Sequence, residues 1–266
     1  MTNKLDCTVL VTGASRGLGR AMALGALEAG ARVIFASSGP SAPLDTTLEK
    51  AKAIGPQERW LSVYGDLRNP DDCERVVQDA AARFGAIDAL VNNAAIPNNG
   101  DGEPFWKIAT EDWERVVRTN VDTVFFMARA VAPAMIARGS GRIINVSTSA
   151  RTMVRPRFSP YGPTKAFMDA ATRLWAGELE GTGVSMNVLA PGGVMDTASD
   201  VTGVAGAGKS YLPADVMVAP LLWLLGEGAA AINGQRFVAS QWDETLPLEQ
   251  RIERARESRG TNPQIM

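Results

Sequence analysis

The sequence predicts an α/β protein with a doubly wound parallel sheet of about seven strands and helices on both faces. Short β-branched runs alternate with helical stretches along the whole chain, as in successive βα units. A glycine-rich turn at residues 12–19 follows the first run and opens a helix. No linker, repeat or low-complexity tract interrupts this alternation, so we expect a single domain.

The strands are assigned to the β-branched and aromatic runs that lie between turn residues. We expect them at residues 8–12, 32–36, 60–64, 89–92, 142–146, 185–190 and 236–239. The Pro- and Ser-containing segment 37–43 should be a loop. The sheet and its helices should span residues 1–242, and residues 243–266 should form a charged helical tail or an arm across a neighbouring subunit.

Local signals bound three of the helices. The first should run from the glycine-rich turn to about Glu28. The second should begin at Thr110, whose hydroxyl caps its first turn, and Gly139 and Gly141 should close it. The third should run from about residue 162 to residue 180.

The third helix combines large apolar residues with small ones. The large apolar face follows core spacing and consists of Phe167, Ala171, Leu174 and Trp175. Three small residues would let another helix approach closely, and these are Ala170, Ala176 and Gly177. A subunit contact is expected on this helix.

Composition excludes several classes of function. The 266 residues carry 27 basic and 29 acidic side chains without a long like-charge run, which predicts neither a nucleic-acid partner nor an anionic membrane partner. The first residues show no signal-peptide core, so a cytoplasmic location is expected. The chain has no His, and Cys7 and Cys73 stand far apart, so no metal site is expected and a His-based triad is excluded.

The glycine-rich turn predicts a dinucleotide site on a Rossmann-type sheet. Gly13, Gly17 and Gly19 lie between a predicted strand and a predicted helix, where backbone N–H groups can face a pyrophosphate. An acid at the end of the second strand would bind the adenosine 2′-hydroxyl, but this chain has Ser38 there and Arg16 in the turn. NADP is therefore favoured over NAD.

Tyr161 and Lys165 form the most informative pair for chemistry. A phenol titrates near pH 10, and an ammonium one helical turn away should lower its pKa by favouring the phenolate. Of the three Tyr residues, only Tyr161 has a Lys four positions on. The pair is suited to general acid–base chemistry.

These motifs, taken in order, resemble the classical short-chain dehydrogenase/reductase family over nearly the whole chain. The motif residues are Thr12 to Gly19, Asp66 in Gly-Asp-Leu, Asn92 to Ala95, Asn120, Tyr161 with Lys165, and Pro191 to Thr197. The resemblance implies an NADP-dependent carbonyl reductase or alcohol dehydrogenase that acts on a small-molecule carbonyl or alcohol and forms a homotetramer or dimer.

The resemblance also implies a role for each site residue. Tyr161 would exchange the proton with the substrate, Lys165 would bind the nicotinamide ribose, and Asn120 would hold a relay water. The residues implied in cofactor binding are Gly13, Ser15, Arg16, Gly17, Leu18, Gly19, Ser38, Asp66, Leu67, Asn93, Ala94, Ala95, Tyr161, Lys165, Pro191, Gly192, Val194 and Thr197.

Two positions depart from the family pattern. Thr148 stands where a Ser usually binds the substrate carbonyl, and its hydroxyl can donate in the same way. Ser147 and Ser149 would replace it if the register shifted by one residue. Ala95 stands where Gly is more usual, and its methyl group narrows the approach to the cofactor.

Substrate selection should come from loops beyond the strand ends, at residues 96–106, 149–160 and 195–210. Arg151, Arg155 and Arg157 could select an anionic substrate, although exposed loop arginines are the more ordinary interpretation. Residues 202–209 are rich in small side chains, as a lid or a loose loop would be. Two alternatives stay open: an NAD-dependent epimerase or dehydratase, and a nonenzymatic cofactor-binding regulatory protein on the same fold.

Overall fold

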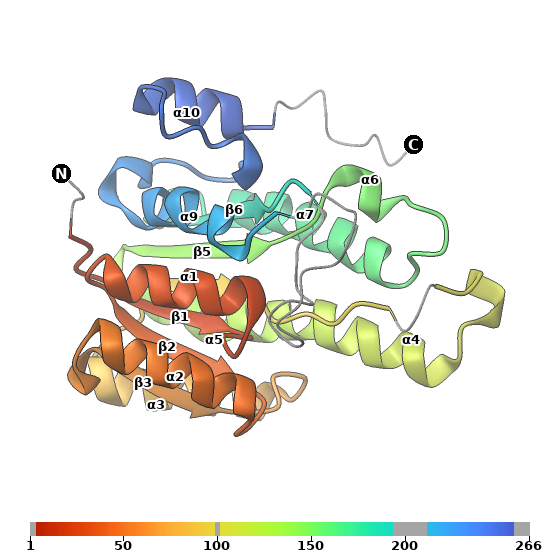
Figure 1. Ribbon diagram of the computed structural model, residues 1–266, viewed down its shortest axis with the longest axis horizontal. Helices are drawn as coiled ribbons and strands as arrows, with labels where there is room; N and C mark the ends of the chain where they lie inside the picture. The colour runs from red at the N-terminus through yellow and green to blue at the C-terminus, as the bar shows by residue number, and fades with distance from the viewer. Residues whose placement is uncertain (1–3, 99–101, 194–211, 258–266) are drawn as a thin grey trace.

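A seven-stranded sheet lies at the centre of the computed structural model, which describes residues 4–98, 102–193 and 212–257 (Figure 1). The strands are β1 (Thr8–Thr12), β2 (Arg32–Ser37), β3 (Trp60–Tyr64), β4 (Ala89–Asn92), β5 (Gly141–Val146), β6 (Val184–Ala190) and β7 (Arg236–Val238). These seven strands pair with one another in parallel, in the order β3-β2-β1-β4-β5-β6-β7. The strand order reverses between β1 and β4, which is where doubly wound sheets bind ligands.

Helices cover both faces of this sheet (Figure 1). Their bounds are α1 (Gly17–Glu28), α2 (Ala42–Ile54), α3 (Pro70–Phe84), α4 (Thr110–Val117), α5 (Thr123–Arg138), α6 (Ala150–Met153), α7 (Tyr161–Glu178), α9 (Val218–Leu225) and α10 (Leu248–Ala255). One core contains buried residues of α1 and α9, and the other contains buried residues of α3, α5 and α7. The predicted fold class is therefore confirmed.

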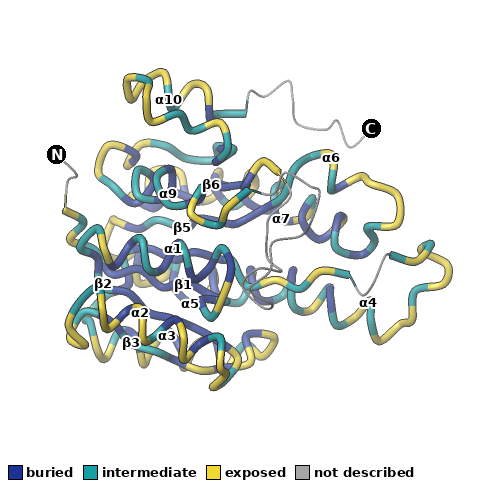
Figure 2. Tube along the Cα trace, in the orientation of Figure 1, coloured by how far each residue is buried: buried dark blue, intermediate teal, exposed yellow. Residues whose placement is uncertain are grey.

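The two cores follow from the alternation of side chains along each strand. Val9 and Val11 of β1 belong to the core beneath α1, while Leu10 between them belongs to the core beneath α3 and α5. Both sets are fully buried, and the central strands are buried along their length (Figure 2). These strands are therefore apolar on both faces. The strand predictions are confirmed, and each end falls within one residue of the predicted position.

The long helical stretch starts at Thr110 and ends before Gly139 as predicted, but its N-cap and the role of Gly141 differ from the prediction. The N-cap is Ala109, and Thr110 already lies inside α4, so the predicted cap by its hydroxyl is wrong. Gly139 ends α5 in the left-handed conformation at φ 69°. Gly141 is instead the first residue of β5. Between α4 and α5, residues Arg118–Asp122 form a π-helical turn that contains Asn120.

The composition and length of the Thr110–Arg138 stretch would also suit a membrane-spanning helix. However, Met127, Val131 and Met135 on this stretch are buried in the core beneath the sheet. We therefore interpret α5 as a packing helix of the α/β fold.

Helix α7 begins at Tyr161 and ends at Glu178. Ala171 is buried as predicted, but 38% of Phe167 and 59% of Leu174 are exposed. Their assignment to the core is therefore wrong, because both residues lie on the outer side of α7. Phe125 of α5 is also exposed, and its ring lies 6.0 Å from that of Trp175 on α7.

Candidate active site

Three predicted catalytic side chains meet where β5 ends and α7 begins. Thr148 follows β5 by two residues, and its hydroxyl lies close enough to the Tyr161 phenol to lower the pKa of that phenol. Tyr161 and Lys165 lie one helical turn apart on α7. The Lys165 Nζ donates to the Val146 carbonyl oxygen at 2.8 Å and lies 5.9 Å from the centre of the Tyr161 ring.

Burial controls the ionisation of this cluster. The Lys165 side chain is almost wholly buried, and this desolvation lowers its pKa to about 8 against an opposing effect of Asp169. Burial also raises the pKa of the Tyr161 phenol, and the hydrogen bond to Thr148 lowers it in part. The predicted lowering of this pKa by Lys165 is wrong for this structure, because burial is the larger of the two causes and the opposing one is Thr148. Tyr161 is therefore a neutral phenol with a proton to donate at neutral pH.

The neighbouring serines have other partners. Ser147 is buried and faces Asp169, whose pKa it lowers. Ser149 is the N-cap of α6, where its hydroxyl accepts from the backbone N–H of Thr152. Of the three candidates at this strand end, Thr148 is the residue that contacts Tyr161.

Asn120 connects the π-helical turn to the loop after β4. Its Nδ2 donates to the Ile96 carbonyl oxygen at 2.9 Å, and its Oδ1 accepts from the Ile96 N–H at 2.9 Å. The same Nδ2 lies 3.2 Å from the Thr164 hydroxyl. Asn120 is fully buried, so it fixes the loop beside Tyr161. Its role in a proton relay stays a prediction.

The glycine-rich turn lies at the switch point of the sheet and is packed without spare room. A Cβ on Gly19 would lie 2.2 Å from the Gly13 carbonyl oxygen and 2.5 Å from Asn93 Nδ2. Asn93 Nδ2 in turn donates to the Thr12 carbonyl oxygen at 2.9 Å. The Thr12 hydroxyl accepts from the backbone N–H groups of Asn93 and Ala94. This close packing brings backbone N–H groups to the N-terminus of α1, which is the arrangement found in pyrophosphate-binding turns.

The residues expected at the adenosine ribose are exposed. Ser38 follows β2, and Arg16 is the N-cap of α1, with no capping bond from its side chain. The buried Arg20 has a different role, because it donates to the Thr47 hydroxyl at 2.8 Å and to the Ser15 carbonyl oxygen at 3.0 Å. It joins the turn to α2, and Arg16 is the arginine that faces solvent.

The other predicted cofactor residues are spread along the same edge of the sheet. Asp66 forms an ion pair with Arg68 at 2.7 Å, which holds the pKa of that carboxyl below its ordinary value. Leu67 is buried, Ala95 is exposed, and Gly192 adopts φ 89°. Ser15 lies in the turn after β1, Gly17 and Leu18 begin α1, and Pro191 directly follows β6. Val194 and Thr197 lie outside the described residues.

Arg151, Arg155 and Arg157 are exposed, which agrees with the interpretation that they are ordinary surface arginines. The Arg155 guanidinium lies 4.5 Å from the centre of the Phe158 ring. The Arg157 carbonyl accepts from Asn98 Nδ2 at 3.4 Å, and Asn98 Oδ1 accepts from the Tyr161 N–H. Arg157 therefore helps to connect the two loops around Tyr161 through its backbone.

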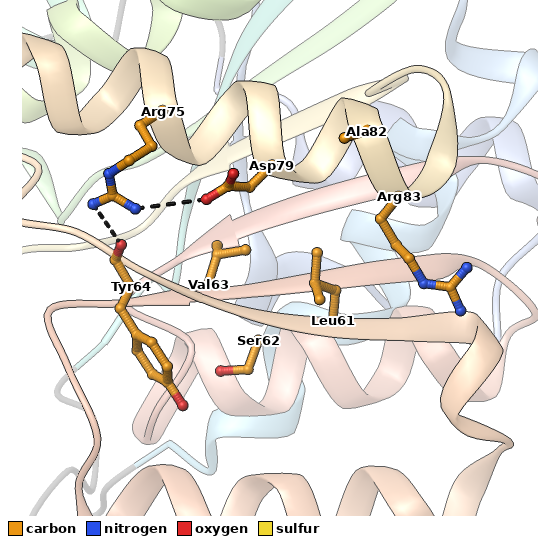
Figure 3. Close-up of a pocket in the computed structure, with 8 residues that line it drawn as sticks. All are labelled: Leu61, Ser62, Val63, Tyr64, Arg75, Asp79, Ala82 and Arg83. Carbon is orange, nitrogen blue, oxygen red and sulfur yellow. Dashed lines mark hydrogen bonds and ion pairs between the residues drawn. The ribbon is translucent and has the colours of Figure 1, made fainter.

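A shallow groove of ≈ 490 Å³ lies elsewhere, on the edge strand β3 beside α3 (Figure 3). Arg75 in this groove contacts the Tyr64 carbonyl oxygen at 2.9 Å and Asp79 at 3.5 Å. Since β3 is four strands away from β5 in the sheet order, the groove is separate from the catalytic cluster.

Sequence reasoning missed two residues of the site, Asp169 and Arg236. Asp169 lies one turn beyond Lys165 on the same face of α7, so the four-residue spacing that starts at Tyr161 could have identified it. Arg236 begins β7, and its Nη2 donates to the Thr148 carbonyl oxygen. No local pattern connects residues 88 positions apart.

The doubly wound sheet and the glycine-rich turn at its switch point define a dinucleotide-binding protein of the Rossmann type. The family model for short chain dehydrogenases matches residues 7–204, so the chain belongs to the short-chain dehydrogenase/reductase family. Members of this family are oxidoreductases that use a nicotinamide cofactor. The resemblance drawn from the motifs is confirmed.

Two enzymes and one solved structure match most of this chain. The chain is 32% identical to 2-dehydro-3-deoxy-D-gluconate 5-dehydrogenase of Escherichia coli K12, over 85% of this chain and 90% of the relative. It is also 32% identical to a 3-oxoacyl-(acyl-carrier-protein) reductase of Staphylococcus epidermidis, over 74% of this chain and 78% of the relative. A short-chain type dehydrogenase/reductase structure from Mycobacterium marinum matches with a TM-score of 0.78 at 26% identity, covering 89% of this chain and 94% of that one.

Proposed function

We propose that this protein reduces a small-molecule carbonyl compound with NADPH and that Tyr161 supplies the proton. The observation that carries the proposal is the grouping of the Tyr161 phenol, the Thr148 hydroxyl and the buried Lys165 ammonium, whose Nζ lies 5.9 Å from the centre of the Tyr161 ring. Bound NADPH would supply the hydride. Since burial raises the pKa of Tyr161, its phenol is protonated at neutral pH and suits a proton donor in reduction.

The other site residues have distinct tasks in this proposal. The Thr148 hydroxyl donates to the substrate carbonyl oxygen and positions it beside the Tyr161 phenol. The Lys165 ammonium has three N–H donors, of which one is bound to Val146, so it can also bind the nicotinamide ribose. Residues 13–19, with Asn93 and Ala94, hold the pyrophosphate side of the cofactor.

NADPH is preferred over NADH in this proposal because the ribose end lacks a carboxylate. Ser38 follows β2 where an acid would bind the 2′-hydroxyl, and the first acid after it is Asp45, in the first turn of α2. The exposed Arg16 guanidinium lies in the turn, where it can bind a 2′-phosphate.

A homodimer or tetramer is part of the proposal, and the outer side of α5 and α7 is its expected contact. Phe125, Phe167 and Leu174 on these helices are exposed apolar residues. Mass measured by light scattering tests this, with Leu174→Glu expected to lower the assembly state. We also propose a cytoplasmic location. The catalytic domain would end at residue 242, and the residues after it would form a C-terminal tail.

The test is turnover of a panel of aldehydes, keto acids, acyl thioesters and sugars, with NADPH and NADH compared by absorbance. Tyr161→Phe should lower kcat by about 10²–10⁴-fold and leave NADPH binding intact. Tyr64→Phe is the matched control, because Tyr64 lies on the distant edge strand β3. If Tyr161→Phe retains the wild-type rate, the proposed role of Tyr161 is rejected.

A further inference from the structure

Lys165 of the catalytic cluster is one of four charged side chains that lie together, and another of the four comes from the C-terminal segment. They are Lys165 and Asp169 of α7, Arg236 of β7 and Glu257 after α10. The Arg236 side chain is 8% exposed, and its Nε lies 3.1 Å from Asp169 Oδ2 and 2.8 Å from Glu257 Oε2. The two cations and two carboxylates balance, and removal of Glu257 would leave an excess positive charge in a largely buried place.

This cluster reaches three consecutive residues at the end of β5. Lys165 donates to the Val146 carbonyl oxygen, Asp169 faces the Ser147 hydroxyl, and Arg236 donates to the Thr148 carbonyl oxygen. The last contact fixes the backbone of the residue whose hydroxyl binds the Tyr161 phenol. Arg236 therefore acts on the Tyr161 phenol only indirectly. It binds the main chain of Thr148, and the side chain of Thr148 lies beside the phenol.

The C-terminal segment is attached to β7 at the same point. Arg256 pairs antiparallel with Phe237, and the Glu257 N–H donates to the Arg236 carbonyl oxygen at 3.0 Å. Backbone and side chain of Glu257 thus both bind Arg236. Helix α10 precedes this contact and lies beyond α9 and β6, at the end of the sheet opposite β3 (Figure 1).

We propose that Arg236, held between Asp169 and Glu257, is a positioning residue for Thr148, so that the C-terminal segment completes the substrate side of the active site. This inference rests on the proposed function of Thr148 and Tyr161. Arg236 does not touch the reacting atoms, and Glu257 acts on Thr148 through Arg236.

A double-mutant cycle in the unliganded protein tests the proposal without any turnover. The Tyr161 ring carbon that bears the hydroxyl is observed by NMR in protein labelled with carbon-13 tyrosine and is assigned with Tyr161→Phe. Thr148→Val removes the hydroxyl that acts on the Tyr161 phenol and should therefore shift this resonance. Glu257→Gln should shift it in the same direction, and in the Thr148→Val background it should add no further shift.

Glu253→Gln is the matched control, because Glu253 lies on the same segment but is 80% exposed and pairs with Arg256. It should leave the resonance in place. If Glu257→Gln does not fold, Glu257→Asp serves in the same cycle, with a smaller shift expected. An unmoved resonance, or a shift that persists in the Thr148→Val background, would overturn the proposal.

Kinetics separate this proposal from the proposed function. With the best carbonyl compound of the panel, Glu257→Gln should lower kcat about tenfold, while KM for NADPH changes less than about twofold, as expected when an interaction used in the transition state is loosened. If the wild-type protein reduces no member of the panel, the proposed function is rejected. The Tyr161 resonance would still show, independently of turnover, whether Glu257 positions Thr148.

Discussion

The cofactor turn and the catalytic cluster lie at the same edge of the sheet but depend on different interactions. The turn is built from backbone groups, glycines and the neutral side chains of Thr12 and Asn93, in contact at van der Waals limits. The catalytic cluster contains the buried Lys165, which adjoins the charge cluster around Arg236, and these two cations are each less than a tenth exposed. Steric fit should therefore limit which substitutions the cofactor turn tolerates. The balance of buried charges should limit them around Lys165 and Arg236.

The largest effect should come from added volume in the turn. Gly19→Ala places a methyl group 2.2 Å from the Gly13 carbonyl oxygen, and the nearest obstacle is backbone that has no alternative rotamer. We expect loss of measurable NADPH binding by fluorescence titration and a lower thermal midpoint. Gly228→Ala is the control, since a Cβ there meets nothing within 4 Å. Wild-type NADPH affinity in Gly19→Ala would contradict the role assigned to shape.

The next effect should come from the buried ammonium. The folded pKa of Lys165 is about 8 and its ordinary value is 10.5, so the unfolded state binds more protons between these two pH values. The free energy of unfolding should therefore rise with pH across that window, by on the order of 3 kcal/mol relative to Lys165→Met. Urea unfolding of both proteins at pH 7.5 and about 10 measures this difference. A constant difference between them would show that Lys165 is not desolvated.

A smaller effect is expected from the hydroxyl beside Tyr161. Thr148→Val keeps the shape but removes the donor, and kcat should fall by about 10²-fold, as for the loss of one preorganised donor. Thr148→Ser keeps the donor and should retain most of the rate. The comparison of these two variants at saturating NADPH separates the hydroxyl from the methyl group. Equal rates for Val and Ser would remove Thr148 from the catalytic cluster.

The smallest effect concerns the charge at the ribose end of the turn. Ser38→Asp places a carboxylate after β2, where it repels a 2′-phosphate and accepts from a 2′-hydroxyl. The ratio of kcat/KM for NADPH over NADH should fall by about tenfold or more, which corresponds to about 1.4 kcal/mol. Asn69→Asp is a matched control, because it adds the same charge at the exposed N-cap of α3. An unchanged ratio for Ser38→Asp would place the ribose elsewhere.

The fold was predictable from the sequence because local chemistry encodes it. The β-branched runs identified every strand, and the turn identified the switch point of the sheet. The helix ends were harder, as at Thr110, where a capping hydroxyl and a first-turn residue look the same in sequence. The outward position of Phe167 and Leu174 was missed because apolar spacing does not show whether a face meets the core or another surface.

The candidate site was predictable only in part. Tyr161 and Lys165 share one helix, so their spacing revealed them, and Thr148 was found through the family resemblance, which implies a hydroxyl residue at that position before the tyrosine. The charge cluster around Arg236 joins residues from α7, β7 and the C-terminal segment, and such contacts leave no local trace. The direction of the Tyr161 pKa shift was also hidden, since it depends on burial that exists only in the folded chain.

In the proposed function, reduction occurs beside Tyr161 with hydride from the nicotinamide. The most direct measurement uses NADPH with deuterium at the transferable C4 position and the best carbonyl compound of the panel. Mass spectrometry should find one deuterium on the former carbonyl carbon of the wild-type product, and Tyr161→Phe should form little of this product while it still binds the cofactor. Product without deuterium, or equal product from Tyr161→Phe, would contradict the account.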